Sequence, residues 1–215
     1  MRLTALVTAG PTREPIDPVR YLSNYSTGKQ GYALAAALAD AGVDVTLISG
    51  PVNLPVPAHV TLKPVETAQE MLTACLETLP VDIAVCAAAV SDWRPQERAV
   101  HKLKKQADQS VLTLHCIKNP DILQTISQHT SRPKLVVGFA LETQDELAHA
   151  EIKLHQKHCD WIVANHARAL GADDNAVSIL QRNVATLTWP SLSKTQLASK
   201  LVALMMEYVT MSSHS

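Results

Sequence analysis

The chain has 215 residues, of which 47% are hydrophobic and 18% are charged. This length suffices for one α/β domain built around a single core. The 19 Lys and Arg side chains nearly balance the 20 Asp and Glu side chains, so the formal net charge is −1. A near-neutral chain gives no electrostatic reason to expect nucleic acid or an anionic membrane as a partner.

Four cysteines, Cys75, Cys86, Cys116 and Cys159, are spread widely along the sequence. They lack the paired spacing of a zinc site, so we expect free thiols in a reducing compartment. No apolar run reaches the length of a membrane span, and Arg2 leads directly into an apolar, strand-like run rather than a signal peptide. We therefore expect a cytoplasmic protein.

Apolar runs alternate with helical patterns along most of the chain. In order, we expect strand 3–8, helix 28–41, strand 43–48, helix 67–79, strand 83–87, helix 120–129, strand 134–139, helix 144–157 and strand 160–164. This alternation is typical of an α/β fold with a doubly wound, mostly parallel, Rossmann-like sheet. The central strands are nearly continuous apolar runs, as helices on both faces require.

Two parts of the chain depart from the alternation. A Pro- and charge-rich excursion follows Asp92 and contains an alternating segment, 111–116, that resembles an exposed strand. The runs 176–180 and 184–189 predict a C-terminal antiparallel hairpin that extends the sheet, and 192–208 has a helical pattern. We expect a single domain over residues 1–210 and a frayed tail at 211–215.

The segment from Asp17 to Lys29 gathers turn formers, hydroxyls, an amide and cations between the first strand and the first helix. Ser26 and Thr27 are candidate N-cap residues beside Gly28 and Lys29. Free backbone N–H groups at such a helix start favour an anion. A capped loop with a solvated lysine is an alternative interpretation of the same residues.

Two common nucleotide motifs are absent from this segment. A P-loop requires Gly five residues before the Gly-Lys pair and a hydroxyl after it, where this chain has Ser23 and Gln30. The glycine fingerprint of dinucleotide-binding folds is also missing, since only Gly10 lies near the end of the first strand. An NAD(P)-dependent reductase is therefore disfavoured.

Ligands of open α/β sheets gather where the parallel strands end, so the polar residues that follow the strands are candidates for a site. They lie in the loops 8–13, 49–51, 87–93, 138–143 and 164–166. Asp92 could bind a ribose hydroxyl or, through water, the Mg²⁺ of a nucleoside triphosphate. Lys102 and Lys104 could share one face of an extended segment and bind phosphate, or form a solvated charge run.

Further candidates lie on two helices. Asn119 and Pro120 have the residue types of an N-cap and a first helical position. Lys153 and Lys157 are four residues apart and so lie on one face of a helix, either in a site or as a surface stripe. The chain has no Ser-centred nucleophile elbow, so covalent catalysis by a protein nucleophile is not expected.

Taken together, these segments resemble the phosphopantothenate–cysteine ligases, or phosphopantothenoylcysteine synthetases, of the bacterial CTP-using type. Such ligases often form the C-terminal half of a bifunctional coenzyme A biosynthesis protein. The resemblance covers about residues 3–180. Its motifs are Thr8–Glu14, Asp17–Lys29, Ala88–Asp92, Lys102–Gln106, Lys118–Ile122, Gly138–Ala140 with Glu142–Thr143, and Ala164–Asn165.

The resemblance implies a ligation in two steps. The carboxylate of 4′-phosphopantothenate attacks the α-phosphorus of the co-substrate CTP, pyrophosphate leaves, and an acyl-cytidylate forms. The amine of L-cysteine then attacks the acyl carbon and releases CMP and 4′-phosphopantothenoylcysteine. Mg²⁺, or Mn²⁺ in its place, would accompany the nucleotide. Because the substrate supplies the nucleophile, the protein needs only to position groups and neutralise charge.

The resemblance also implies roles for individual residues. Asn24 would orient the acyl-cytidylate and bond its carbonyl, and Lys102 would stabilise charge at the α-phosphate. Asp92 would bind CTP and its metal ion. The other residues implied for CTP binding are Cys86, Ala87, Ala88, Pro120, Asp121, Ile122, Leu123, Phe139, Lys153 and Lys157. The candidates for phosphopantothenate binding are Ser26, Thr27, Gly28 and Lys29.

Members of this family are commonly homodimers in which a strand-like excursion of one subunit reaches the other, so 111–116 and the late hairpin are candidate interfaces. A phosphopantothenoylcysteine decarboxylase is a further possible partner, since the flavin-binding decarboxylase half usually fused upstream is not in this sequence. Ser91, Trp93 and Leu141 depart from the residues usual at those places, which we expect to alter packing more than chemistry. A non-catalytic nucleotide-binding subunit is the competing interpretation.

Overall fold

The structure, a computed structural model, describes residues 2–104, 110–141, 146–165, 174–182 and 184–212. Its main strands are β1 (Thr4–Ala9), β4 (Asp44–Ser49), β5 (Val60–Pro64), β6 (Ile83–Cys86), β9 (Leu135–Leu141), β10 (Trp161–Asn165), β11 (Asp174–Gln181) and β12 (Val184–Ser193). They form one eight-stranded sheet in the order β12-β11-β10-β9-β6-β1-β4-β5. The strands from β10 to β5 run parallel, and β11 and β12 add an antiparallel edge.

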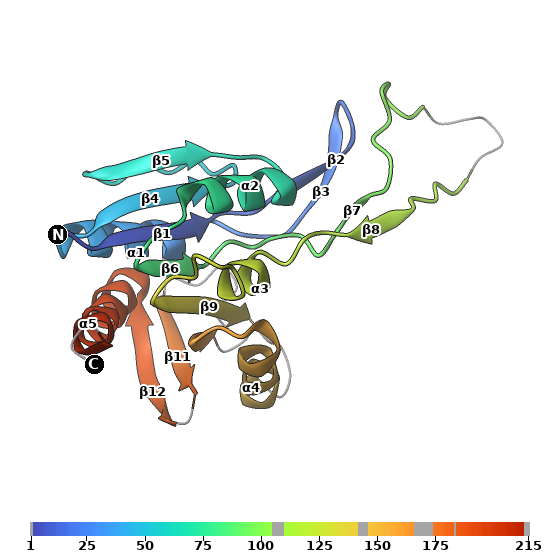
Figure 1. The fold of residues 1–215 in the computed structure, drawn as a ribbon. Coiled ribbons are helices and arrows are strands. Elements are labelled where there is room, and N and C mark those ends of the chain that lie inside the picture. Colours follow the sequence, from blue (N-terminus) through green and yellow to red (C-terminus); the bar gives the residue numbers. More distant parts are fainter. Residues whose placement is uncertain (1, 105–109, 142–145, 166–173, 183, 213–215) are drawn as a thin grey trace.

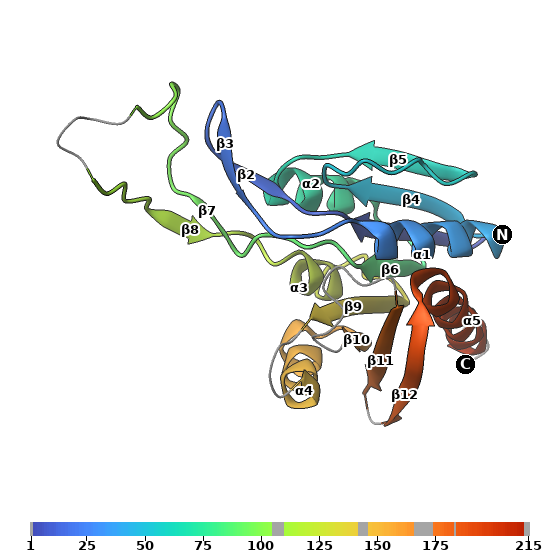
Figure 2. The same cartoon turned by 180° about the vertical axis from the view of Figure 1, so that it is seen from behind.

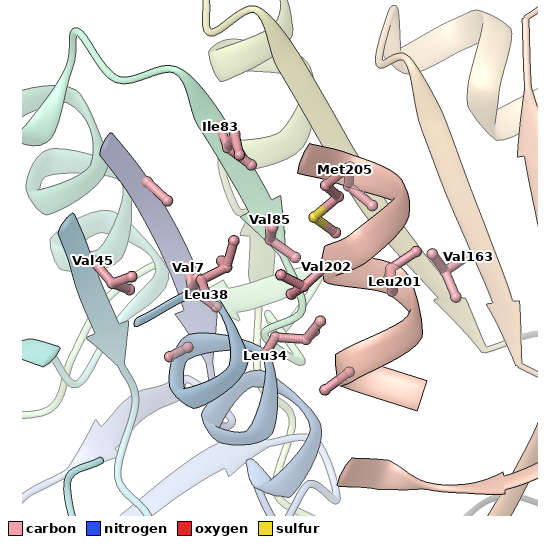
Figure 3. Packing of buried hydrophobic residues seen from close by; sticks show 14 of the residues in the cluster. Val7, Leu34, Leu38, Val45, Ile83, Val85, Val163, Leu201, Val202 and Met205 are labelled. Carbon is pink, nitrogen blue, oxygen red and sulfur yellow. The ribbon is translucent and has the colours of Figure 1, made fainter. Parts of the chain in front are cut away.

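Helices cover both faces of this sheet (Figure 1). The first face carries α1 (Lys29–Asp40) and α5 (Lys194–Ser212), and the second carries α2 (Ala68–Thr78), α3 (Ile122–Ser127) and α4 (Glu146–Lys157). Alternate residues of a strand point to opposite faces. Accordingly Val7 packs with Leu34 and Val202 on the first face (Figure 3), while the neighbouring Leu6 belongs to the cluster on the second.

The predicted α/β fold with a mostly parallel sheet and a late antiparallel hairpin is confirmed. All five predicted parallel strands occur within two residues of their predicted ends. The hairpin strands are longer than expected, and α5 extends through Ser212 into the expected tail; residues 213–215 lie outside the described residues. Sequence analysis missed the edge strand β5, a short run whose residues are half-buried or exposed and which contains only two alternating apolar residues, Val60 and Leu62.

Two short ribbons lie outside the main sheet: β2 (Arg13–Asp17) pairs with β3 (Arg20–Ser23), and β7 (Trp93–Pro95) pairs with β8 (Cys116–Lys118), both antiparallel. With the segments 96–104 and 110–115 they project away from the sheet, on the side toward which β1 and β4 point (Figures 1 and 2). We call residues 13–23, 93–104 and 110–118 the arm.

The prediction of a strand at 111–116 was wrong. Only Cys116 of that segment is in a strand, because β7 spans three residues and pairs Trp93 with Lys118 and Pro95 with Cys116. Beyond this ladder the backbone N–H of Gln96 still donates to the carbonyl of His115 at 2.9 Å, but residues 111–115 are not in a strand. Among the described helices, none is long and apolar enough to cross a membrane.

Candidate functional site

Two adjoining cavities open where the parallel strands end. The first, of about 710 Å³, lies between the loop after β6 and the start of α3, and we call it the α3 cavity. The second, of about 770 Å³, lies at the start of α1, and we call it the α1 cavity. They share the lining residues Ala88, Val90, Asp92, Phe139 and Lys153. One continuous site can therefore accommodate two joined ligands.

The structure brings together nearly all of the predicted site residues. The α3 cavity is lined by Cys86, Ala88, Asp92, Pro120, Asp121, Ile122, Leu123, Phe139, Lys153 and Lys157. The α1 cavity is lined by Asn24, Ser26, Thr27, Gly28, Lys29 and Ala87. Lys102 is exposed and lines neither of these two cavities. The predicted nucleotide residues thus gather in the first cavity, and the predicted phosphopantothenate residues gather in the second.

The start of α1 is held tightly against the sheet. Gly28 has a φ of 73° and occupies the N-cap position, so the prediction of Ser26 or Thr27 as the cap was wrong. Each of these two hydroxyls instead accepts from the backbone N–H two residues on, at 3.3 and 3.4 Å. A Cβ added to Gly31 would lie 2.5 Å from the Cβ of Ala9, so only glycine allows this close approach. No side chain caps α1, which leaves backbone N–H groups directed at the cavity.

Asn24 is anchored to the loop that separates the two cavities. Its Nδ2 donates to the carbonyl of Val90 at 3.0 Å. The neighbouring Ser23 donates to the carbonyl of Thr12, and the Thr12 hydroxyl accepts from the backbone N–H of Ser91. The segment after β3 and the loop after β6 are therefore one hydrogen-bonded unit, with a second amide hydrogen of Asn24 available to a ligand.

The two lysines of α4 reach the end of the sheet. Lys153 donates to the carbonyl of Phe139 at 3.0 Å, and Lys157 forms a salt bridge with Asp121. Both side chains line the α3 cavity, which favours the prediction of a site over that of a surface stripe. Asp121 offsets the charge of Lys157, and the ammonium groups of both lysines are of the type that binds phosphate.

The prediction of Asn119 as the N-cap of the third helix was wrong. Asp121 occupies that position and accepts from the backbone N–H of Gln124 at 2.9 Å, so α3 begins at Ile122. Asn119 donates instead to the carbonyl of Ser91 at 2.8 Å and accepts from Arg94. It therefore connects the loop after β6 to the entrance of α3, where the side chain of Asp92 is exposed.

The buried carboxylate of Asp17 connects two segments of the arm, the β2–β3 ribbon and the segment around Leu103. Asp17 forms a salt bridge with Arg20 and accepts from the backbone N–H groups of Val19, Arg20 and Leu103. Burial disfavours the charged form, but the hydrogen bonds from Arg20, Val19 and Leu103 outweigh it and hold the pKa of Asp17 well below its usual range. Arg20 also donates to the carbonyl of Leu103. The residue that follows Lys102 is thus fixed to the β2–β3 ribbon.

The thiols offer no nucleophile to the site. Burial raises the pKa of Cys86 well above its usual range, although this residue lines the α3 cavity. A neutral thiol is a poor nucleophile and a poor metal ligand. In the described part of the chain, no three His, Cys, Asp or Glu side chains are grouped so as to hold a metal ion. Cys86 is therefore not a candidate nucleophile in this cavity.

Sequence reasoning gave no role to Arg94, which lies beside the site, or to Gln30 in its wall, and it named Asn165 only within a motif and a loop at the sheet edge. Arg94 donates to the carbonyl of Lys118 and to Asn119, and no motif signalled it. Gln30 and Asn165 line the α1 cavity with buried amide atoms that have no hydrogen-bond partner among the described residues. The position after Lys29 was the only signal for Gln30, whereas Asn165 belongs to the motif Ala164–Asn165 and to the loop 164–166 at the sheet edge.

The comparisons with known proteins agree with this geometry. The chain is 44% identical over 210 residues to the coenzyme A biosynthesis bifunctional protein CoaBC of Vibrio cholerae, covering 94% of this chain and 52% of that protein. It is 44% identical over 183 residues to CoaBC of Escherichia coli, covering 82% of this chain and 45% of that protein. The chain therefore spans about half the length of the curated relatives it matches.

A crystal structure of the C-terminal domain of CoaBC superposes with a TM-score of 0.81 at 34% identity, covering 99% of this chain and 97% of that domain. The similarity thus extends over a complete domain. The family model named DNA/pantothenate metabolism flavoprotein C-terminal domain matches residues 2–209. These matches, together with the fold, show that the chain belongs to the family of the DNA/pantothenate metabolism flavoprotein C-terminal domain.

Proposed function

We propose that this chain is a phosphopantothenate–cysteine ligase of coenzyme A biosynthesis that uses CTP. The observation that carries the proposal is the pair of joined cavities, one lined by the predicted nucleotide residues and the other by the predicted phosphopantothenate residues. A reaction that joins two substrates through an acyl-cytidylate requires such a site. The similarity to CoaBC, named for coenzyme A biosynthesis, supports this assignment.

The chain's own residues would act by positioning and by charge. Lys153 and Lys157 would hold the nucleotide in the α3 cavity, and the uncapped start of α1 with Lys29 would hold the phosphate of phosphopantothenate. The attacking carboxylate would then meet the α-phosphorus near the shared residues Ala88 and Asp92. Alignment of two reacting groups accelerates the step without a protein nucleophile.

Asn24 borders this meeting point, because its amide is bonded to Val90 at the boundary of the two cavities. We assign it to the acyl-cytidylate, where one amide hydrogen would bond the acyl carbonyl. Charge that develops on this oxygen during the attack of the cysteine amine would strengthen the bond.

Asp92 fits a role beside Mg²⁺ or Mn²⁺. Its side chain is exposed at the boundary of the cavities, and a single carboxylate together with substrate phosphates is a common set of Mg²⁺ ligands. The ion would neutralise charge on the triphosphate when bound. Asp92 would bind the ion directly or through a water molecule.

To act on the nucleotide, Lys102 would have to reach the site of a second copy of the chain. The residue lines neither cavity of its own chain, yet we assign it to charge at the α-phosphate. The arm also exposes large apolar side chains: Val19, Tyr21, Trp93, Val100, Val111, Leu112 and Ile117. We propose a homodimer in which these residues are covered and Lys102 reaches the partner's site. Because the curated relatives are about twice as long, a decarboxylase is the further partner we propose.

The first experiment is incubation of the pure protein with CTP, Mg²⁺ and 4′-phosphopantothenate, with and without cysteine. We expect pyrophosphate in both cases, and CMP with the cysteine adduct only when cysteine is present. ATP in place of CTP tests the choice of nucleotide. Absence of pyrophosphate with either nucleotide would contradict the proposal and favour a non-catalytic nucleotide-binding domain.

The four free cysteines agree with the cytoplasm as the place of the reaction.

A further inference from the structure

Two side chains in the wall of the α1 cavity are buried without satisfying their hydrogen-bonding groups. Both amide atoms of Gln30, Nε2 and Oε1, have no partner among the described residues, and the same holds for Oδ1 of Asn165. Gln30 comes from the first turn of α1, and Asn165 is the last residue of β10. Both residues line the α1 cavity, so two elements far apart in sequence contribute buried, unpaired amide atoms to its wall.

Buried polar atoms are nearly always paired, because an unpaired donor or acceptor has lost its bonds to water. A leucine or methionine at position 30 would avoid this loss of folding free energy. An unpaired amide that lines a cavity is instead explained by a ligand that completes its bonds. Because both amide atoms of Gln30 are unpaired, exchanging the oxygen and the nitrogen still leaves one donor and one acceptor without a partner.

The pattern of unpaired atoms selects among the chemical groups of the proposed substrates. Gln30 needs one acceptor and one donor, and Asn165 needs a second donor. A phosphate at neutral pH supplies acceptors almost exclusively, so it would leave both amide oxygens unpaired. The middle of 4′-phosphopantothenate carries a secondary amide and a hydroxyl, which together supply two donors and two acceptors.

The position agrees with this match. The proposed phosphate contacts, Ser26 to Lys29, immediately precede Gln30, and the proposed reaction point at Asp92 lies at the other boundary of the α1 cavity. The pantoyl amide lies between the phosphate and the carboxylate of the substrate, so it must cross the part of the cavity between these two ends.

Resting on the proposed function, we propose that Gln30, together with Asn165, is a specificity-determining residue that hydrogen-bonds the amide and hydroxyl of phosphopantothenate. Gln30 binds the substrate and does not take part in bond making. Its loss therefore weakens binding of one substrate and leaves the chemistry of the bound complex intact.

The test compares Gln30→Leu with Gln69→Leu in the full chain. Gln69 is the matched control, because it is also the second residue of a helix but is exposed. For Gln30→Leu we expect the KM for phosphopantothenate to rise about tenfold or more, with the KM for CTP and cysteine within about twofold of wild type. The melting temperature should stay the same or rise, since an unpaired amide is removed. Gln69→Leu should change none of these values.

A substrate analogue with an ester in place of the pantoyl amide sharpens the test. The wild type should bind the ester more weakly than the amide, and Gln30→Leu should discriminate less between the two, because coupled partners are not additive. An unchanged KM for phosphopantothenate, a rise confined to CTP or cysteine, or a lower melting temperature with normal kinetics would overturn the inference. Wild-type release of pyrophosphate is measured in the same assay, so failure of the proposed function is recognised separately.

Discussion

The rim of the sheet and the arm are built in opposite ways. At the rim, hydrogen bonds join neighbouring segments: Asn24 to Val90, Asn119 to Ser91, and Lys153 to Phe139. The arm consists of two-stranded ribbons, which are marginally stable on their own, and it exposes large apolar side chains. The difference indicates that one chain forms the walls of both cavities, and it supports the proposal that another surface covers the arm.

The largest effect is expected at Lys102 on the arm. Lys102→Gln should lower kcat by about a hundredfold or more, because an aligned cation at a phosphorus that gains charge is a large contribution to catalysis. The melting temperature should hardly change, since an exposed lysine contributes little to stability. Steady-state kinetics and thermal unfolding are the measurements, with Lys104→Gln as the control. A large loss of melting temperature with normal turnover would mean that Lys102 is structural.

The next largest effect is expected at Asn24, which lies at the rim of the sheet. Asn24→Ala should slow the second step by about tenfold to a hundredfold, because one hydrogen bond to the developing oxyanion is lost. The acyl-cytidylate should accumulate while CTP still binds with normal affinity. Rapid quenching and chromatography detect the intermediate. Unchanged ligation by the variant would exclude the assigned role.

Mixing the two variants separates an arm that acts on its own chain from one that acts on its partner. In a mixed dimer of Lys102→Gln and Asn24→Ala chains, one site regains both residues if Lys102 acts across the dimer. Equal mixing and exchange of subunits should then restore about a quarter of wild-type activity, since half the dimers are mixed and each has one intact site. No restoration despite demonstrated exchange would place both residues in the same chain.

A smaller effect is expected at Asp17, which fixes the arm to Leu103. Asp17→Asn should lower the melting temperature at pH 7, because the buried salt bridge with Arg20 is lost. The pKa of Asp17 is lowered in the fold, so its stabilisation is present above the unfolded pKa of about 3.9 and is lost as pH falls through the folded value. Melting curves of both proteins should therefore converge only in strong acid. A constant difference at all pH values would contradict the assigned charge effect.

The smallest effect concerns the thiols. Cys116 is exposed on the arm and should react first with a thiol reagent at neutral pH. Burial raises the pKa of Cys75 to about 12 and that of Cys159 to about 11, so these thiols should react slowly. Reaction with a thiol reagent followed by peptide mapping measures the rates at Cys116 and at the buried cysteines. Fast reaction of Cys86 would contradict its neutral, shielded state.

Much of the sheet could be predicted because its central strands are short apolar runs, and such runs are typical of strands buried on both faces. The runs around Val85, Val137 and Val163 are buried on both faces, and each was placed within two residues. The ribbon of β2 and β3 is a local hairpin that was missed because its strands lack an apolar pattern. The ribbon of β7 and β8 was missed because two three-residue strands pair across a long intervening segment. Hydrogen bonds such as that of Leu103 to Asp17, 86 residues away, leave no local signal.

The sequence by itself therefore determined the sheet, the helices that cover it and the family, because periodicity and motif order are local properties of the chain. It also named most of the residues that line the cavities. Only the tertiary structure decided which of those residues share a wall, that Gly28 rather than Ser26 or Thr27 caps α1, and that Lys102 lies outside the cavities of its own chain. The physical reason is that burial, unpaired amides and the distance between two loops arise only when segments far apart in sequence pack together.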